Sequence, residues 1–424
     1  MSLMNKNKPR IVVSEPISLI DSPVKITIQD VKPGEKVTIK AKRIATGIKK
    51  LELESYAIFI VDRSGKVELD SQEPISGSYS GVDGMGLFWS LDLTKIEELS
   101  LNSEYNVAPL APQTFTLYLE INQTIVHEIK ITRLWKSDHI ALHEIRENGL
   151  VGTLFCMNDR TPLPAIIVLG GSEGGINEYL PALLSSHGFT VFALAYFGME
   201  DLPKQVVRIP LEYMKSAIDW IKSRPEAIPN WIGIHGTSKG SELALLTASF
   251  FQEIKAVVSL NGSAISFSGI VPWSEDEKLP PAWTYKGIPI PYASPKNPIN
   301  VALECIEMRQ KGVGDPLEKW YNALCSDPEV VEKAVIPVEK INGNILLVSG
   351  KEDFTYRYSK KAIDRLQSYE SSYNYKHLIY EGAGHSIGIP YVYYSQGNKK
   401  ATATASLDSW KRTIEFFHES LETN

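Results

Sequence analysis

The segment Trp231-Ile-Gly-Ile-His-Gly236-Thr-Ser238-Lys-Gly240-Ser-Glu-Leu-Ala-Leu-Leu246 decides the fold class of this chain. It opens with an apolar run typical of a buried strand, and apolar residues recur at helical spacing from Leu243 onward. Between the two stands a Gly-x-Ser-x-Gly pattern with Ser238 at its centre. In this strand–turn–helix context the pattern predicts a sharp turn that exposes an activated serine. We expect glycine at both flanking positions because a Cβ atom would clash in such a turn.

Ser238 is the candidate nucleophile of this turn. Its strained backbone is expected to lift the hydroxyl above the sheet, where the start of the following helix offers free N–H groups and a positive dipole end. The N–H of Lys239 is therefore one candidate donor of an oxyanion hole. Since a five-residue pattern also arises by chance in an ordinary glycine-rich turn, the assignment depends on partner residues elsewhere in the chain.

Candidate partners of Ser238 follow in the chain order Ser, Asp, His that is typical of α/β-hydrolases. Asp353 comes just after one apolar strand-like run, and His385 lies in a Gly-x-Gly-His turn after the next. Both positions fall at the carboxyl ends of expected strands, where an open parallel sheet places its site. We expect His385 to accept the proton of Ser238 and Asp353 to orient the imidazole. Glu352 is the rival for the second role, although a longer side chain next to the strand end should point away.

A second half of the oxyanion hole is expected in the loop Gly170-Gly-Ser172-Glu173-Gly-Gly175, which follows another apolar run. Its glycines would let backbone N–H groups approach a developing oxyanion closely. The N–H of Ser172 or of Glu173 is the candidate donor. A phosphate-binding loop is disfavoured, because neither the Walker spacing nor a G-x-G-x-x-G pattern is present.

The chain is expected to form two domains. In residues 11–138, short segments alternate apolar and polar residues between turn signals, which predicts an antiparallel β-sandwich. In residues 139–424, strands alternate with helical stretches, which predicts the mostly parallel sheet of an α/β-hydrolase. This alternation fails at about 264–337, an insertion rich in proline and aromatic residues that we expect to form a lid over the site. The alternative is a surface excursion without a catalytic part.

Composition sets further bounds on function and location. Charged residues make up 22% and hydrophobic residues 43% of the chain, the balance of a globular rather than a disordered protein. The net charge of −6 argues against a nucleic-acid binder. Three widely spaced cysteines suggest neither a disulfide framework nor a metal cluster. No run is long enough to span a membrane, and the N-terminus is not a signal peptide, so a cytoplasmic location is expected. The chemistry needs no metal or redox cofactor, and the oligomeric state stays open.

Further motifs accompany the serine turn, in order along most of the chain. They are Gly77-Ser-Tyr-Ser-Gly-Val-Asp-Gly-Met-Gly-Leu-Phe-Trp89, Ala193-Leu-Ala-Tyr196, Glu200-Asp-Leu-Pro-Lys204, Asn261-Gly-Ser263, Gly384-His385 with Ile389-Pro-Tyr391, and Asp408-Ser-Trp-Lys411. On these residues the chain resembles the acyl-CoA thioesterase and bile acid-CoA:amino acid N-acyltransferase family. The resemblance implies an acyl-CoA substrate and a role in fatty acid metabolism, whereas spacing and periodicity show only a serine hydrolase.

Within that family, the amide-forming members use cysteine where this chain has Ser238. A serine acyl-enzyme is an oxygen ester that water attacks readily, while a thioester intermediate suits aminolysis better. The resemblance therefore favours hydrolysis to a free acid and coenzyme A. Transfer of the acyl group to an amino acid, a carboxylesterase or peptidase activity, and a non-catalytic binding role are the alternatives.

Two features of the substrate stay open at this stage. The insertion around Pro295–Cys325 is longer than in the animal members of the family, so the preferred acyl chain is not implied by the resemblance. The sequence does not identify the basic groups that bind the phosphates of coenzyme A, and Lys204 and Lys239 are named as candidates only.

Overall fold

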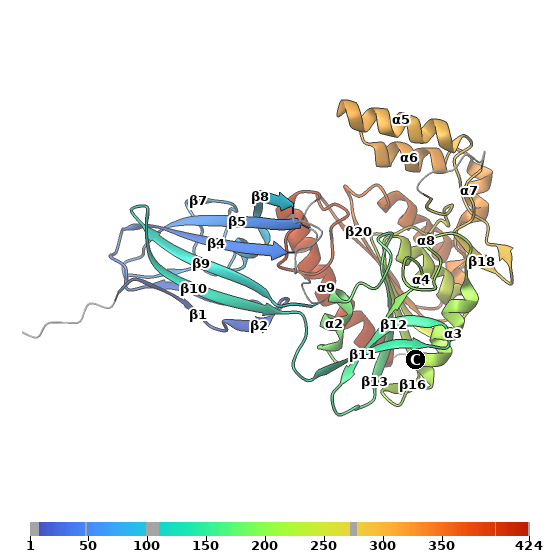
Figure 1. Ribbon diagram of the computed structural model, residues 1–424, viewed down its shortest axis with the longest axis horizontal. Helices are drawn as coiled ribbons and strands as arrows, with labels where there is room; N and C mark the ends of the chain where they lie inside the picture. Colours follow the sequence, from blue (N-terminus) through green and yellow to red (C-terminus); the bar gives the residue numbers. More distant parts are fainter. Residues whose placement is uncertain (1–7, 47–48, 99–109, 272–277, 395, 423–424) are drawn as a thin grey trace, which may run out of the picture. The chain divides into compact units, whose positions relative to one another are not determined.

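A computed structural model of the chain describes residues 8–46, 49–98, 110–271, 278–394 and 396–422. These residues divide into two units (Figure 1). The first unit contains the chain up to Ser137 together with Ile389–Leu407, and the second contains Asp138–Gly388 together with the chain from Asp408 onward. None of the helices in the described ranges combines the length and the hydropathy of a bilayer-spanning segment.

An eight-stranded sheet forms the centre of the second unit. In spatial order its strands are β11 (Ile140–Glu147), β12 (Leu150–Met157), β14 (Thr190–Ala195), β13 (Leu163–Leu169), β16 (Ala227–Thr237), β17 (Ile254–Leu260), β20 (Asn344–Gly350) and β21 (Tyr375–Tyr380). The pairs β11–β12 and β12–β14 are antiparallel, and the other pairs are parallel. Since helices separate the parallel strands along the chain, this is the α/β-hydrolase fold that the sequence predicts.

Strands in the middle of this sheet are apolar along their length because both of their faces are covered. Every residue of β14 and of β20 is buried, which explains the continuous apolar runs in the sequence. The sequence pattern does not reveal strand β11 at the edge of the sheet. Only its residues Ile140 and Ile145 are buried, so no apolar run marks it.

The helices of the second unit include α2 (Tyr179–Ser185), α3 (Leu211–Lys222), α4 (Lys239–Phe250) and α8 (Tyr356–Ser368), and α9 (Lys399–Glu422) is the last helix of the described chain. Among them, α3 and α8 follow from amphipathic stretches of sequence, whereas α2 and α4 are buried on nearly all sides. Helix α3 buries Met214, Ala217, Ile218 and Ile221, the stripe that its spacing predicts.

Two sheets pack face to face in the first unit. The smaller sheet contains β1 (Arg10–Val13), β3 (Ile26–Gln29) and β6 (Val67–Glu68). The strands of the larger sheet are, in spatial order, β2 (Ile17–Leu19), β10 (Thr124–Leu134), β9 (Gln113–Ile121), β4 (Lys36–Thr46), β5 (Lys49–Ile60) and β7 (Ser76–Gly77). Strand β8 (Asp92–Glu98) also pairs with β5. Alternate residues of β9, namely Phe115, Leu117 and Leu119, enter a core shared with the smaller sheet and with the short helix α1 (Gly86–Trp89). This arrangement is the predicted β-sandwich.

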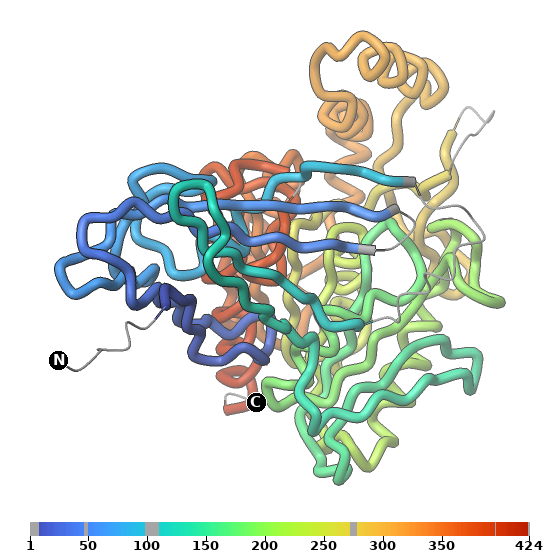
Figure 2. The backbone as a smooth tube through the Cα atoms, turned by 60° about the vertical axis from the view of Figure 1, so that its left-hand side comes forward, coloured from blue at the N-terminus to red at the C-terminus, as the bar shows by residue number. Residues whose placement is uncertain are grey.

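The predicted domain division needs one correction. The sequence assigned the whole chain from residue 139 to the second domain, but Ile389–Leu407 belongs to the first unit. Tyr394 and Ala403 lie in the apolar core of that unit, and Lys399 Nζ donates to the carbonyl oxygen of Leu91 at 2.7 Å. Figure 2 shows this late segment, in red, alongside the blue N-terminal strands. The order of elements along the chain cannot predict that Ile389–Leu407 packs in the first unit, because this packing depends on tertiary contacts alone.

The predicted insertion lies between β17 and β20. Apart from residues 272–277, which lie outside the described part, it contains β18 (Trp283–Tyr285), β19 (Ile288–Pro289), α5 (Pro298–Lys311), α6 (Pro316–Leu324) and α7 (Pro328–Ala334), and the 3₁₀ turn Val338–Lys340 follows it. Strands β18 and β19 form a small sheet with β15 (Ile209–Pro210). Each of the three helices begins at a proline, whose missing N–H would have no helical partner there. The carboxylates of Asp315 and Asp327 cap α6 and α7 by accepting backbone N–H groups.

Two histidines, His235 on β16 and His377 on β21, make stability depend on pH. Burial lowers the pKa of each imidazole from 6.5 to about 4. Between these values the unfolded chain binds protons that the native fold excludes, so stability rises with pH in this window and is lost as pH falls through it. We expect each histidine to remove about 2 kcal/mol from the free energy of unfolding between pH 7 and pH 5.

Denaturant titrations at the two pH values check this expectation. His377→Gln should reduce the loss by roughly 2 kcal/mol, since it removes one of the two groups. His418→Gln, at an exposed position of α9, is the matched control and should leave the loss unchanged. An equal loss in all three proteins would contradict the assignment to His377.

Candidate active site

Ser238 lies in the sharp turn between β16 and α4. Its backbone angles are φ 53° and ψ −117°, a combination that a non-glycine residue adopts only under strain. A Cβ atom at Gly236 would lie 2.2 Å from the carbonyl oxygen of Gly240, and one at Gly240 would lie 2.2 Å from that of Gly170. The glycines on both sides of Ser238 are therefore required by close backbone approach, as the sequence predicts.

The side chains of Ser238, His385 and Asp353 lie next to one another, as the sequence predicts. His385 Nε2 lies 3.1 Å from Ser238 Oγ, and His385 Nδ1 lies 2.8 Å from Asp353 Oδ2, both within hydrogen-bond range. Asp353 is buried just beyond β20, where it also accepts bonds from the backbone N–H and the hydroxyl of Thr355. Glu352 is exposed, so Asp353 and not its neighbour holds the imidazole.

Two residues hold the loop that carries His385. Asn261, directly after β17, donates from Nδ2 to the carbonyl oxygens of His385 at 3.0 Å and of Ile387 at 2.8 Å. The ring of Phe354 stacks on the imidazole with centroids 5.7 Å apart. The sequence marks Asn261 only as part of a motif. Its place after a parallel strand, on the same sheet edge as the other site residues, is the signal that could have indicated its role.

The loop after β13 lies against the nucleophile. A Cβ atom at Gly171 would be 3.2 Å from Ser238 Cβ. The N–H of Gly171 donates to Glu173 Oε1 at 3.0 Å, so this N–H is already engaged. The N–H groups of Ser172 and Glu173 stay the predicted donors of one half of an oxyanion hole. Lys239 begins helix α4, so its N–H has no partner within the helix and stays the predicted donor of the other half.

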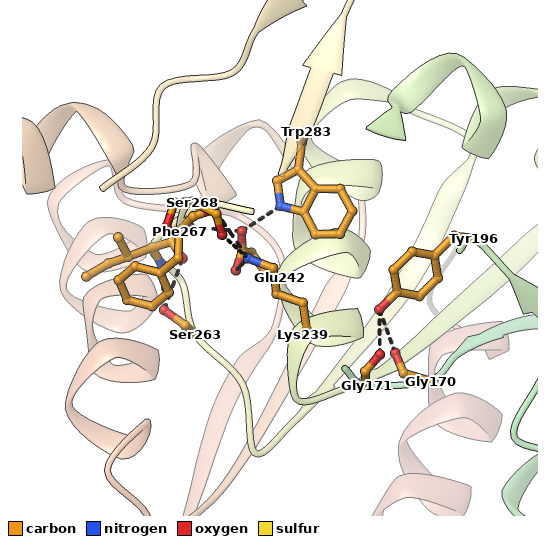
Figure 3. Close-up of polar contacts among 10 residues, drawn as sticks. Gly170, Gly171, Tyr196, Lys239, Glu242, Ser263, Phe267, Ser268 and Trp283 are labelled. Carbon is orange, nitrogen blue, oxygen red and sulfur yellow. Dashed lines mark hydrogen bonds and ion pairs between the residues drawn. The ribbon is translucent and has the colours of Figure 1, made fainter. Parts of the chain in front are cut away.

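Tyr196, at the end of β14, contacts this loop through its hydroxyl group. Its hydroxyl lies 2.9 Å from the carbonyl oxygens of both Gly170 and Gly171 (Figure 3). Burial raises the pKa of the phenol well above its ordinary value, so the group stays a donor. Because the Gly171 carbonyl and the Ser172 N–H belong to one planar peptide group, the bond from Tyr196 to this carbonyl fixes the orientation of one candidate oxyanion donor.

We expect Tyr196→Phe to lower kcat by about tenfold or more, because small displacements of a positioned group are costly in the transition state. Tyr213→Phe is the matched control, since the partly buried hydroxyl of Tyr213 donates to the carbonyl oxygen of Ala195 rather than to this loop. Kinetics and denaturant unfolding of both variants separate the effect on catalysis from the effect on stability. Both variants should be less stable, and only Tyr196→Phe should have a lower kcat. Equal kcat values would contradict a positioning role.

A buried ion pair joins Lys239 and Glu242 in the first turn of α4 (Figure 3). Lys239 Nζ is 2.8 Å from Glu242 Oε2 and also approaches the carbonyl oxygens of Phe267 and Ser268 at 3.3 and 3.5 Å. Glu242 Oε1 accepts the N–H of Phe267 at 3.0 Å and the indole N–H of Trp283 at 2.5 Å. The pair thus ties the start of helix α4 to the insertion.

This pair corrects one expectation. Burial lowers the pKa of Lys239 and raises that of Glu242, while their contact opposes both shifts. With its ammonium buried and fully bonded, Lys239 cannot bind the phosphates of coenzyme A, so that prediction was wrong. Lys204 is exposed and stays a prediction. The sequence gives no signal for the pair beyond an i, i+3 spacing, which is common on exposed helix faces.

Fold and site together define the class of protein: an α/β-hydrolase with a serine, a histidine and an aspartate in hydrogen-bond contact. Residues 21–147 match the family model "Acyl-CoA thioester hydrolase/BAAT N-terminal region", and residues 209–423 match "BAAT / Acyl-CoA thioester hydrolase C terminal". The chain therefore belongs to the acyl-CoA thioester hydrolase/BAAT family.

Curated relatives align over nearly the whole chain. Acyl-coenzyme A thioesterase 1 of Homo sapiens is 29% identical over 420 residues, covering 95% of this chain and 94% of its own. Acyl-coenzyme A amino acid N-acyltransferase 2 of Mus musculus is 30% identical over 428 residues, covering 95% and 96%. Among solved structures, an esterase of Pyrobaculum calidifontis aligns over 66% of this chain and 84% of its own, with 13% identity and a TM-score of 0.43.

Proposed function

We propose that this protein hydrolyses acyl-CoA thioesters to a free acid and coenzyme A. The observation that carries the proposal is the position of His385, within hydrogen-bond reach of both Ser238 and Asp353. Membership of a family whose members include acyl-CoA thioesterases supports the choice of substrate. A serine hydrolase site alone would fit any activated acyl compound.

The geometry supports the following mechanism. Ser238 Oγ attacks the thioester carbonyl carbon while His385 Nε2 accepts the hydroxyl proton, and Asp353 stabilises the imidazolium through Nδ1–H. The N–H of Lys239 and one from Ser172 or Glu173 stabilise the negative oxygen of the tetrahedral intermediate. When the C–S bond breaks, His385 returns the proton to the sulfur and coenzyme A leaves as a thiol. His385 then deprotonates a water molecule that attacks the acyl-serine ester, which frees the acid and restores Ser238.

Transfer of the acyl group to an amino acid is the second candidate, because relatives at similar identity include N-acyltransferases. The serine at position 238 favours hydrolysis. Its acyl-enzyme is an oxygen ester, which is less reactive toward amines than the thioester that a cysteine would form. An acyl-serine in a site open to water is expected to react with water first.

A substrate panel tests the proposal. Purified protein is incubated with acyl-CoAs from acetyl to palmitoyl, with and without glycine or taurine, while free thiol is measured by colorimetry and products by mass spectrometry. We expect thiol release with free acid as the only acyl product in all mixtures. Amide product that grows with amine concentration would favour transfer, and turnover of p-nitrophenyl esters without turnover of any acyl-CoA would favour a carboxylesterase.

The compartment is part of the proposal as well. Cys156, Cys305 and Cys325 are free thiols, which suits a reducing environment. We propose a cytoplasmic location, and fractionation of the native host cells tests it. Recovery of the protein with a membrane-enclosed organelle would contradict it.

A further inference from the structure

A groove of about 380 Å³ lies within the insertion, a size in the usual range for small-molecule sites. One wall is the helical hairpin α5–α6, and the other is the chain around Phe267–Val271 with Leu279. The residues of α5 in the lining are Pro298, Ile299, Ala302, Cys305, Ile306 and Arg309, and those of α6 are Pro316, Leu317, Trp320, Tyr321 and Leu324. Both sets recur at helical spacing, so one stripe of each helix lines the groove. On α6, Trp320, Tyr321 and Leu324 also pack on the apolar cluster that contains Phe267.

The groove adjoins the candidate active site. Lys239, which contributes to its lining, directly follows Ser238 in the chain. Tyr321, also in the lining, packs on Phe354 with centroids 4.4 Å apart, and Phe354 stacks in turn on His385. A group bound covalently to Ser238 would therefore have this groove beside it.

The Lys239 ammonium and the Cys305 thiol in the lining are both engaged within the protein. Lys239 Nζ is bonded to Glu242 and to two carbonyl oxygens, so the groove is lined by the methylene groups of this side chain. Cys305 Sγ donates to the carbonyl oxygen of Pro316 at 3.2 Å. Among the described lining residues Arg309 is the other charged one, and it lies near the turn of the hairpin. Most of the groove is lined by apolar groups, so we expect it to bind an apolar ligand.

We infer that this groove binds the hydrocarbon chain of the acyl group and that hairpin α5–α6 limits its length. The inference rests on the proposed function, since it assigns the groove to the same substrate. Two helical stripes facing a chain segment make an elongated slot, which suits an unbranched acyl chain better than a fused ring system. An exposed ion pair between Glu304 and Lys319, at 2.5 Å, joins the two helices.

Ala302→Trp tests the inference, because this small residue of α5 lines the groove and a bulky ring would fill it. Gln310→Trp is the matched control on an exposed, non-lining position of the same helix, and Cys305→Trp is a second filling variant. We expect both filling variants to lower kcat/KM for palmitoyl-CoA by at least about tenfold, and to leave that for acetyl-CoA within about twofold. The control should match the unmodified protein on both substrates.

A binding measurement separates failure of the inference from failure of the proposed function. Fluorescence titration with the fatty acid cis-parinaric acid is made on Ser238→Ala, alone and combined with Ala302→Trp. Binding that is lost in the double variant supports the groove even if no acyl-CoA is hydrolysed. Normal hydrolysis of palmitoyl-CoA by both filling variants overturns the inference while leaving the proposed function intact. Equal losses for acetyl- and palmitoyl-CoA overturn it as well.

Discussion

Ser238→Ala is expected to lower kcat for acyl-CoA hydrolysis by about 10⁴-fold or more, the loss typical when a serine nucleophile is removed. Without the hydroxyl no acyl-enzyme forms, and the remaining groups can only assist direct attack by water. The substitution keeps Cβ, so the strained backbone at φ 53° is burdened no further. Thiol release under substrate saturation measures the effect.

Two controls make this result specific. Ser368→Ala changes an exposed serine whose hydroxyl bonds to the backbone of its own helix, and it should not alter kcat. A fluorophosphonate probe should label the unmodified protein and leave Ser238→Ala unlabelled. Residual activity of more than a few per cent in Ser238→Ala, with labelling retained, would mean that another residue is the nucleophile.

The meeting of Ser238, Asp353 and His385 could be predicted because two rules of different range agree. The local pattern around Ser238 specifies a sharp turn, and parallel strands bring their carboxyl ends to one edge of the sheet. Residues placed just beyond successive strands must then approach one another, whatever their separation along the chain. The distances of 3.1 and 2.8 Å are the outcome of that topology.

Contacts that follow no periodic pattern could not be predicted in this way. The sequence gives no hint that Tyr196 holds the carbonyls of Gly170 and Gly171, and for Asn261 it offers only a place on the sheet edge, not the bond to the His385 loop. The return of Ile389–Leu407 to the first unit is of the same kind. Each of these contacts depends on tertiary packing, which produces no periodic pattern in the sequence.

Lys239 and Glu242 show how a wrong residue role arises from a sound general rule. A cation near a nucleophile suggests phosphate binding, and most lysines are exposed. Here the chain supplies a carboxylate one helical turn later, two carbonyl oxygens and an indole N–H, which together satisfy both buried charges. Removing one partner of such a pair usually costs more than the pair contributes, because the other charge is left unpaired. The pair is therefore better understood as a fixed link between the nucleophile turn and the insertion.

Asp353→Asn is expected to lower kcat by about 10⁴-fold with little change in KM, because an amide can hold the imidazole in the tautomer that cannot accept the serine proton. Asp353 is buried and bonds to Thr355, so the substitution can also lower stability. Denaturant unfolding of the Asp353→Asn variant must therefore be measured alongside its kinetics.

Glu352→Gln supplies the control for this result, since it removes the neighbouring carboxylate at an exposed position and should change kcat by less than about twofold. The two variants differ in one respect that matters: only Asp353 touches His385 Nδ1. If Glu352→Gln lost the greater part of the activity and Asp353→Asn kept it, the orienting carboxylate would be the other one. His385 would then have to turn away from the position that it occupies between Ser238 and Asp353, and the proton path derived from that position would fail with it.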